Sequence, residues 1–329
     1  MSKFILHGFA VVLSHFTVTP LIFNSRLFYK ARQSFFVRYT SCNKPMSFAS
    51  VLRQELAERA LKFAQSDNLP YALSYGVMPV VCFAPDENQS VHGNFIRTSY
   101  KAIISKPIWR RRLTKVHTQA RRWLPPAANG RWRELDSCMS SDALLMNIFC
   151  YPGVARAERV FAMLGVDSVS KPRFGHKARV PLINGRFDRT EIDMHLGNLL
   201  VEAKLTETDF QRAEKRVLMA YRDFLDVFHH EELPQTDSHY LCYQLLRNVL
   251  AAHAMHCSFC VLLDARRPDL IEGWYAVMKC VKPVELRGAL RVLTWQELAD
   301  VLPSRLRAFL DSKYGIGAHS QSSLALRKV

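Results

Sequence analysis

Acidic residues are scarce in this sequence, and its first 54 positions contain none, since Glu55 is the first carboxylate. Over 329 residues, 29 acids stand against 45 lysines and arginines, which gives a formal net charge of +16. This shortage of negative charge favours a polyanionic partner, either nucleic acid or an anionic membrane surface. A hydrophobic content of 49% with 22% charged residues excludes a disordered chain and predicts a folded one.

Long hydrophobic runs are also missing. After residue 45 no stretch has the roughly 18 uninterrupted apolar residues that a membrane-spanning helix needs, so we expect no membrane-spanning body. Residues 4–23 are apolar, but two histidines and Pro20 interrupt them. For residues 1–45 three interpretations stay open: a weak signal or membrane segment, an arginine-rich transit peptide, or an upstream in-frame start with translation from Met46. We favour the last, because helical periodicity begins only after Met46.

A disulfide framework is not expected either. Eight dispersed cysteines in a chain of this length are typical of a reducing cytoplasm. Cys257 and Cys260, with His253 and His256, could form half of a zinc or iron–sulfur site, but no second CxxC pair follows. We therefore interpret these two cysteines as buried structural thiols. The sequence also has no glycine-rich loop of the kind that binds phosphate.

Hydrophobic periodicity divides the remaining chain. Residues 46–136 form a basic N-terminal region with a helix after Met46 and a short strand near residue 81. Residues 137–312 contain, in order, a helix capped by Ser140 or Ser141, a helix ending at Gly165, three strands (173–183, 186–196 and 198–205), helices at 208–228 and 238–255, and a strand at 258–265. A last helix starts with a capping box at Thr294 and Glu297. Residues 313–329 are expected to be a flexible tail.

The N-terminal region contains a basic tract. No acid occurs between Glu87 and Glu134, and ten lysines or arginines fall between Lys101 and Arg133, with three tryptophans among them. Cations mixed with aromatic residues are suited to a phosphate backbone and stacked bases. The alternative is a solvated helix face whose tryptophans pack on the core. The candidate nucleic-acid contacts are Arg110, Arg111, Arg112, Lys115, Arg121 and Arg122.

The segment "RTEIDMHLGNLLVEAKL", residues 189–205, predicts a hairpin around Gly197-Asn198. A two-residue turn fixes the register, so Asp193 should lie opposite Glu202, and Glu191 opposite Lys204. Because side chains alternate along a strand, these four share one face. The other face should be the core, with Ile192, Met194 and Leu196 against Leu199, Val201 and Ala203.

Two carboxylates directly opposite each other have Cβ atoms only about 5 Å apart. Such a pair is destabilising unless a cation lies between the groups or one of them is protonated. Lys204 can neutralise one charge, and an oxygen-rich pocket that remains negative is what Mg²⁺ prefers. The hairpin therefore indicates a metal site centred on Asp193 and Glu202. An exposed, salt-bridged hairpin face is the alternative.

The order of elements, with Asp193 on the second strand and Glu202-Ala203-Lys204 on the third, resembles the PD-(D/E)XK nuclease superfamily over residues 137–300. The stretches "SSDALLMN", "VEAKLTE" and "YQLLRN" are similar to a subgroup of bacterial proteins described as restriction endonucleases. The resemblance implies an α/β fold with a restriction-endonuclease-like αβββαβ core, in which helices flank a mixed central four-stranded sheet. It also implies a bacterial, cytoplasmic protein.

The resemblance further implies roles for individual residues. Asp193 and Glu202 would hold Mg²⁺, or Mn²⁺ in its place, with help from the backbone carbonyl of Ala203. Lys204 would orient the attacking water or stabilise charge on the phosphate. Asp142, Glu191 and Gln244 are auxiliary candidates, although the first core strand lacks the acid that many members carry. Gln244, Arg247 and Asn248 share one helical stripe that would contact phosphate or the metal-bound water, or else form interhelical hydrogen bonds.

The sequence therefore predicts metal-dependent hydrolysis of DNA, as an endonuclease of restriction or defence type. RNA stays open as a substrate, and so does a homodimer. Three rival functions remain: a degenerate member of the fold that only binds nucleic acid, a nuclease of DNA repair or transfer-RNA processing, and a membrane-surface protein with an authentic basic N-terminus.

Overall fold

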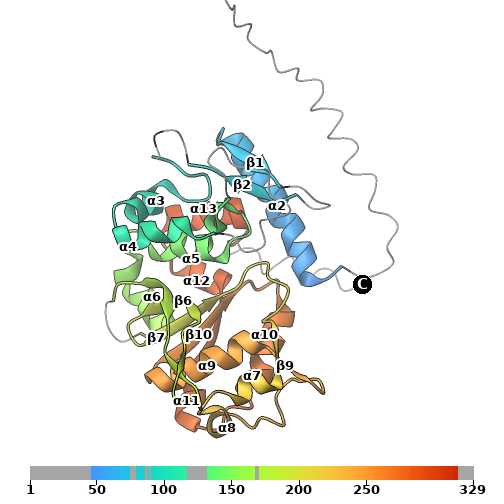
Figure 1. Cartoon of the computed structure of the whole chain (residues 1–329). Coiled ribbons are helices and arrows are strands. Elements are labelled where there is room, and N and C mark those ends of the chain that lie inside the picture. The colour runs from blue at the N-terminus through green and yellow to red at the C-terminus, as the bar shows by residue number, and fades with distance from the viewer. Residues whose placement is uncertain are drawn as a thin grey trace, which may run out of the picture. The chain divides into compact units, whose positions relative to one another are not determined.

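Figure 1 shows the computed structural model of the chain, which describes residues 46–74, 79–85, 88, 90–116, 132–166 and 170–317. The interpretations of residues 1–45, of Arg121 and Arg122, and of residues 318–329 lie outside these ranges. One compact unit begins at Met46, so the basic N-terminal region and the segment 137–312 belong to the same unit. None of the described helices is long and apolar enough to cross a membrane.

The centre of the unit is a mixed sheet with the strand order β11-β10-β7-β6-β3. β3, β6 and β7 are antiparallel neighbours, whereas β7, β10 and β11 run parallel. Their bounds are Arg173–Lys177 (β3), Glu191–Leu196 (β6), Leu199–Ala203 (β7), Ser258–Leu263 (β10) and Leu290–Thr294 (β11). The predicted α/β fold with its αβββαβ core is confirmed, but the central sheet has five strands rather than four. β11, the additional strand, lies at the edge of the sheet, where it pairs with β10.

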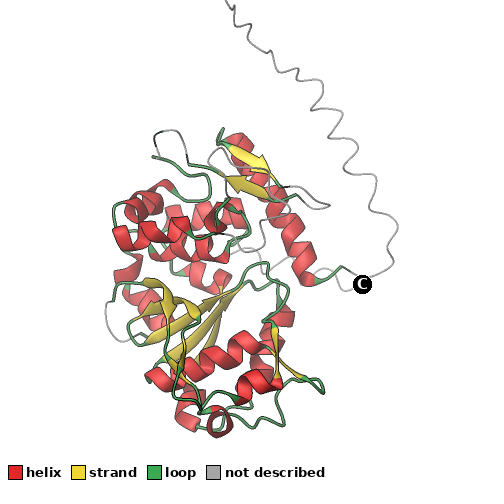
Figure 2. Ribbon diagram, viewed as in Figure 1, coloured by secondary structure: helices red, strands yellow, loops and turns green. Residues whose placement is uncertain are grey.

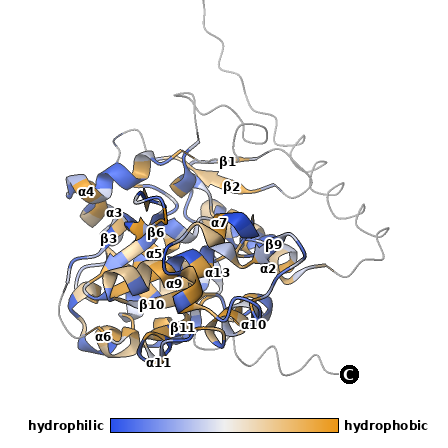
Figure 3. Cartoon of the chain, turned by 60° about the horizontal axis from the view of Figure 1, so that its bottom comes forward, coloured by the Kyte–Doolittle hydropathy of each residue, from blue (hydrophilic) through white to orange (hydrophobic). Residues whose placement is uncertain are grey.

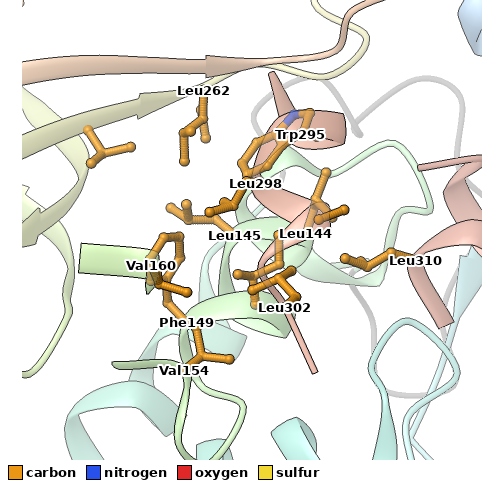
Figure 4. Close-up of a cluster of buried hydrophobic side chains, with 14 of the residues drawn as sticks. Leu144, Leu145, Phe149, Val154, Val160, Leu262, Trp295, Leu298, Leu302 and Leu310 are labelled. Atoms are coloured by element: carbon orange, nitrogen blue, oxygen red, sulfur yellow. The ribbon is translucent and has the colours of Figure 1, made fainter. Parts of the chain in front are cut away.

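Helices cover both faces of this sheet (Figure 2). On one face, α5, α6, α12, α13 and α2 build the first core, part of which is drawn in Figure 4. On the other face, α9 and α10 lie over the second core. The bounds are Phe48–Ser66 (α2), Ser141–Phe149 (α5), Glu158–Leu164 (α6), Tyr243–Met255 (α9), Pro268–Met278 (α10), Trp295–Asp300 (α12) and Ser304–Tyr314 (α13). Figure 3 shows hydrophobic residues concentrated in the central strands and the helices packed on them.

The basic region forms a small layer beside α5. Besides α2, it contains the two-stranded sheet β1-β2 and four short helical segments, the last of which is η2 (Glu134–Asp136), and it packs a third core cluster around Trp109, Tyr100 and Leu135. The bounds are Tyr71–Leu73 (β1), Val81–Phe83 (β2), Arg97–Ile104 (α3), Pro107–Arg110 (α4) and Arg111–Thr114 (η1). Trp109 and Trp132 are buried, as the alternative interpretation of the tract expected.

Local signals located several helix ends correctly. The Ser140 side chain accepts a hydrogen bond from the Ala143 N–H and caps α5. Gly165 ends α6 with a φ of 63°, and Thr294 and Glu297 form the predicted capping box of α12. α13 continues to Tyr314, and Lys313 and Ile316 are buried, so the chain stays packed beyond residue 312.

The long helix predicted for residues 208–228 is wrong. This stretch forms β8 (Arg212–Glu214), α7 (Lys215–Met219) and α8 (Phe224–Val227). β8 pairs with β9 (His239–Leu241), which also shortens the predicted helix 238–255 to α9. Two short helices with turns between them bury Leu218, Tyr221, Phe224 and Val227. Because these apolar residues recur every three positions, the sequence pattern resembled that of one continuous helix.

The first two predicted strands of the core are each interrupted. Residues 173–183 contain β3 and then β4 (Val180–Pro181), and residues 186–196 contain β5 (Phe187–Asp188) and then β6. β4 and β5 form a separate two-stranded sheet beside the central one.

Candidate active site

The predicted hairpin is present, with Gly197 at a φ of 61° in its turn. Leu196 pairs with Leu199, His195 with Leu200 and Met194 with Val201, so the predicted register is confirmed over these pairs. In regular pairing, the next hydrogen bond would run from the Ala203 N–H to the Ile192 carbonyl. Instead, the Ala203 N–H donates to Oδ2 of Asp193 at 2.8 Å.

This change of hydrogen-bond acceptor explains why the prediction for Ile192 was wrong. Ile192 was expected on the same core face as Met194 and Leu196, but it lies in the second core with Leu200. The carboxylate of Asp193 takes the partner that regular pairing would have given to the Ile192 carbonyl, so the strand turns at this point. Across the sheet, Gly175 lies opposite Asp193 in the β3–β6 register and has a φ of +62°. Glycine adopts this left-handed conformation at little cost, whereas a side chain there is strained.

Glu202 and Lys204 are buried beneath α9. Each is only 3–4% exposed, which excludes the alternative of an exposed, salt-bridged face. Nζ of Lys204 lies 2.8 Å from Oε1 of Glu202 and donates to the Gln244 side-chain oxygen at 2.8 Å. Nδ2 of Asn248 donates to the other oxygen of Glu202 at 2.8 Å.

The third residue of the stripe, Arg247, is turned toward β6. Its guanidinium donates to the backbone carbonyl of Glu191 at 3.1 Å and to the side-chain oxygen of Asn248. α9 therefore brings all three predicted side chains of the stripe to the hairpin, and their hydrogen bonds run to β6, to β7 and Lys204 after it, and within α9.

Charges around Asp193 and Lys204 shift their pKa values. Burial, and then the like charges of Glu202 and Asp142, raises the pKa of Asp193 well above its usual range. Burial alone would lower the pKa of Lys204, but Glu202, Glu207 and Asp193 outweigh it and raise that pKa. Lys204 therefore remains an ammonium, and one cation faces both Asp193 and Glu202.

Asp142 and Glu191 form a second acidic pair at the same site. Arg112 bridges them, with one guanidinium nitrogen 2.7 Å from Asp142 Oδ2 and another 2.6 Å from Glu191 Oε1. Nζ of Lys115 lies 2.9 Å from Asp142 and 3.3 Å from Glu191. Although burial opposes its ionisation, Arg112 and Lys115 lower the pKa of the Asp142 carboxyl.

The predicted nucleic-acid contacts thus separate into two groups. Arg112 and Lys115 point inward and are engaged with carboxylates, while Arg110 and Arg111 are exposed. The inward direction of Arg112 also depends on Gly175, since a Cβ at residue 175 would lie 2.5 Å from a guanidinium nitrogen of Arg112. The sequence did not indicate this contact, because nothing local links residues 112 and 175.

Sequence reasoning also missed two groups that hold Lys204 in place. Oε2 of Glu207 accepts from the Leu205 N–H at 2.6 Å, and Oε1 accepts from the Ser141 hydroxyl at 2.8 Å. The indole N–H of Trp295 donates to the backbone carbonyl of Lys204 at 2.8 Å. Glu207 lies in the quoted stretch "VEAKLTE". Its position two residues after Leu205 is the only local signal for the hydrogen bond that it accepts from the Leu205 N–H.

The donor set at the site consists of oxygens. Oδ1 of Asp142 is buried and has no hydrogen-bond partner, and the raised pKa of Asp193 shows that its ionised form lacks a compensating cation. These observations fit a hard divalent cation better than a soft one. Within the described residues, no three His, Cys, Asp or Glu side chains are gathered closely enough to hold an ion. Mg²⁺ is commonly held by one or two carboxylates plus water and phosphate oxygens, so this set is compatible with it.

The two cysteines considered for a metal site do not approach such a geometry. Cys260 is fully buried in β10, where burial raises the pKa of its thiol to about 12, and Cys257 is partly buried. For Cys260 the interpretation as a buried structural thiol is confirmed.

Comparisons with known proteins place the chain in a family. Residues 72–315 match a family model described as "Restriction Endonuclease associating with ARP". No curated protein and no solved structure matches the chain. The family match covers well over half of the sequence and spans the central sheet, the hairpin and α9. The chain therefore belongs to the family of restriction endonucleases associating with ARP.

Proposed function

We propose that this protein is a metal-dependent nuclease that hydrolyses phosphodiester bonds of DNA, as an endonuclease of restriction type with a PD-(D/E)XK site. The observation that carries the proposal is the group of the half-buried Asp193 with the buried Glu202 and Lys204, in which two carboxylates share one ammonium. Membership of a restriction-endonuclease family supports the reaction class.

In this proposal Asp193 and Glu202 hold Mg²⁺ or Mn²⁺, with the Ala203 carbonyl as a further oxygen ligand. The bound ion supplies Lewis acidity and lowers the pKa of a water molecule. The Ala203 N–H fixes one oxygen of Asp193, and Asn248 fixes one oxygen of Glu202, so both carboxylates are oriented before an ion arrives. Such orientation by outer partners typically strengthens metal binding.

Lys204 acts as a donor rather than as a base. Its raised pKa keeps the proton on Nζ, so the ammonium cannot accept a proton from water near neutral pH. It can stabilise the negative charge that develops on the phosphoryl oxygens. Gln244 accepts a hydrogen bond from Nζ at 2.8 Å and helps to position it.

A second candidate function is binding without cleavage. Arg112 and Lys115 already neutralise Asp142 and Glu191, and the described residues contain no group of three potential ligands. Both observations favour a degenerate site that has lost its ion.

The test is cleavage of supercoiled plasmid in Mg²⁺ or Mn²⁺ by wild type, by Lys204→Gln, and by Lys279→Gln as an exposed-lysine control. We expect wild type and the control to cut, and Lys204→Gln to lose about two orders of magnitude in rate, the usual scale for one electrostatic catalytic group. Lys204→Arg keeps the buried cation and hence the fold, but it moves the donor, so it should also be slow. Wild type that binds DNA but never cuts would establish the degenerate binder, and undiminished cutting by Lys204→Gln would place the chemistry elsewhere.

A further inference from the structure

The β3–β6 and β4–β5 ladders follow one another along the same two chain segments, which we call the ribbon. Lys177 pairs with Glu191 in the β3–β6 ladder, and Val180 pairs with Asp188 in the β4–β5 ladder, in the same register. The register therefore continues across the gap between the two ladders. The ribbon closes in a turn in which the Leu182 N–H donates to the Arg186 carbonyl at 2.9 Å.

The two faces of this ribbon differ in character. The inner face is packed, since Ala178 and Val180 are buried in the second core, and Asp188 accepts a hydrogen bond from the Tyr221 hydroxyl at 2.7 Å. The outer face alternates with it and carries exposed side chains. We name the exposed residues Lys177, Arg179, Phe187 and Arg189 the outer ribbon surface.

Positive charge on the outer ribbon surface is not compensated. The register places Arg179 opposite Arg189, and like charges directly opposite each other destabilise a pair of strands. Among the described residues neither arginine makes an ion pair, and the nearby Asp188 is turned inward. The guanidinium of Arg179 lies 4.3 Å from the ring centroid of Phe187, in a cation–π contact. An anion between the two arginines would remove the repulsion.

This surface leads directly to the candidate active site. Glu191 follows Arg189 by two residues, so their Cα atoms are about 6.6 Å apart along the strand. Glu191 also lies opposite Lys177 and contacts Arg112 and Lys115. A phosphate held by Arg189 would belong to the same stretch of polymer as a phosphate at Asp193.

We propose that the outer ribbon surface binds the backbone phosphates of duplex nucleic acid next to the reacting phosphodiester. The inference rests on the proposed function for the nature of the polymer. A two-stranded ribbon has dimensions that a DNA groove admits, and paired arginines match phosphate geometry through bidentate hydrogen bonds. The charged edge strand could instead serve only to prevent sheet-to-sheet aggregation, and the experiment separates the two roles.

The experiment measures binding of a labelled 30-base-pair duplex in EDTA, where no cleavage occurs, over a series of salt concentrations. The variants are Arg179→Gln/Arg189→Gln and, as a matched control, Lys279→Gln/Arg305→Gln on exposed positions of the α10 C-terminus and α13. Loss of two phosphate contacts should lower the slope of log affinity against log salt by about 1.8 and weaken binding roughly tenfold or more at 0.1 M salt. Arg179→Lys/Arg189→Lys keeps both charges and should retain a slope close to that of wild type.

The ribbon proposal is overturned if Arg179→Gln/Arg189→Gln binds like the control, or if wild type does not bind duplex. Unchanged binding with increased light scattering would assign the arginines to edge protection. If the double variant aggregates too strongly to measure, Arg189→Gln alone should lower the slope by about 0.9. Failure of the proposed function is distinguishable: wild type would then never cut with Mg²⁺ or Mn²⁺, while the salt slopes would still differ between the two double variants.

Discussion

Two pairs of carboxylates share one site in this protein, and they differ in the number of cations that face them. Asp142 and Glu191 are bridged by Arg112 and Lys115, so two cations balance two acids. Asp193 and Glu202 have Lys204 alone.

The pKa values record this difference. Burial by itself raises the pKa of both Asp142 and Asp193, although Asp142 is fully buried and Asp193 only partly. The neighbouring cations reverse that effect for Asp142, whereas neighbouring acids add to it for Asp193. The opposite directions of the two pKa shifts therefore come from the neighbouring charges. We propose that the balanced pair serves the fold and that the unbalanced pair is the one that gains from an external cation.

The largest effect should come from removing one of the two cations that face Asp142 and Glu191. Arg112→Ala leaves Asp142 buried with one partner fewer, and removing one member of a buried ion pair costs about 3–5 kcal/mol. We expect a large fall in the urea midpoint. Arg110→Ala, one helical segment away and exposed, should change the midpoint little. An Arg112→Ala protein as stable as Arg110→Ala would show that the bridge contributes nothing.

A smaller loss of stability is expected from substituting Gly175, which leaves room for the Arg112 guanidinium. Gly175→Ala introduces a side chain at a φ of +62°, where its Cβ would lie 2.5 Å from the Arg112 guanidinium. Left-handed strain and displacement of Arg112 together should cost roughly 1–3 kcal/mol. The same substitution at Gly288, where a Cβ meets no atom within 4 Å, is the control. Equal unfolding midpoints for the two variants would contradict the close approach.

The raised pKa of Asp193 should make the free energy of unfolding depend on pH when no metal is present. Since the pKa of Asp193 is raised in the folded state, the folded state holds that proton more tightly than the unfolded chain. Its contribution to stability is complete at low pH, and it declines as pH rises from about 4 through the folded pKa, by at most about 1.4 kcal/mol per pH unit. In EDTA, Asp193→Asn should therefore gain stability relative to wild type as pH rises. A constant difference between the two proteins from pH 4 to 8 would contradict the raised pKa.

The smallest effect, on DNA binding, is expected from Arg110 and Arg111, which contact neither pair of carboxylates. Arg110 and Arg111 are exposed, so their replacement by alanine should weaken duplex binding equally for all sequences and lower the salt slope by about 1.8. Arg112 makes no such contribution in our account, because its guanidinium is held by Asp142 and Glu191. Fluorescence anisotropy with the Arg110→Ala/Arg111→Ala protein checks this. A slope equal to that of wild type would remove this surface from the binding site.

The hairpin illustrates what the sequence could predict. A two-residue turn at Gly197-Asn198 determines the register, and alternation then determines the partners, so local rules led to Leu196↔Leu199 and its neighbours. The same holds for Thr294 and Gly165, where capping chemistry is contained within four residues. The α/β class followed from the order of such segments.

Other features depend on contacts between distant segments. The direction of Arg112 is set by Asp142, Gly175 and Glu191, none of which is near it in sequence. The turn of the strand at Ile192 arises because a side chain outcompetes a main-chain carbonyl for the Ala203 N–H, which no periodicity reveals. The burial of Glu202 under α9 likewise comes from tertiary packing.

The central claim, that Asp193 and Glu202 form a cation-deficient metal site, is tested most directly by Mn²⁺ binding to the full chain, with free ion measured by electron paramagnetic resonance. Asp193→Asn is compared with Asp237→Asn, which lies in the loop before β9. Our account predicts saturable binding to wild type and to Asp237→Asn, and an affinity at least about tenfold lower for Asp193→Asn. Binding that is absent from wild type, or that survives Asp193→Asn unchanged, would contradict it.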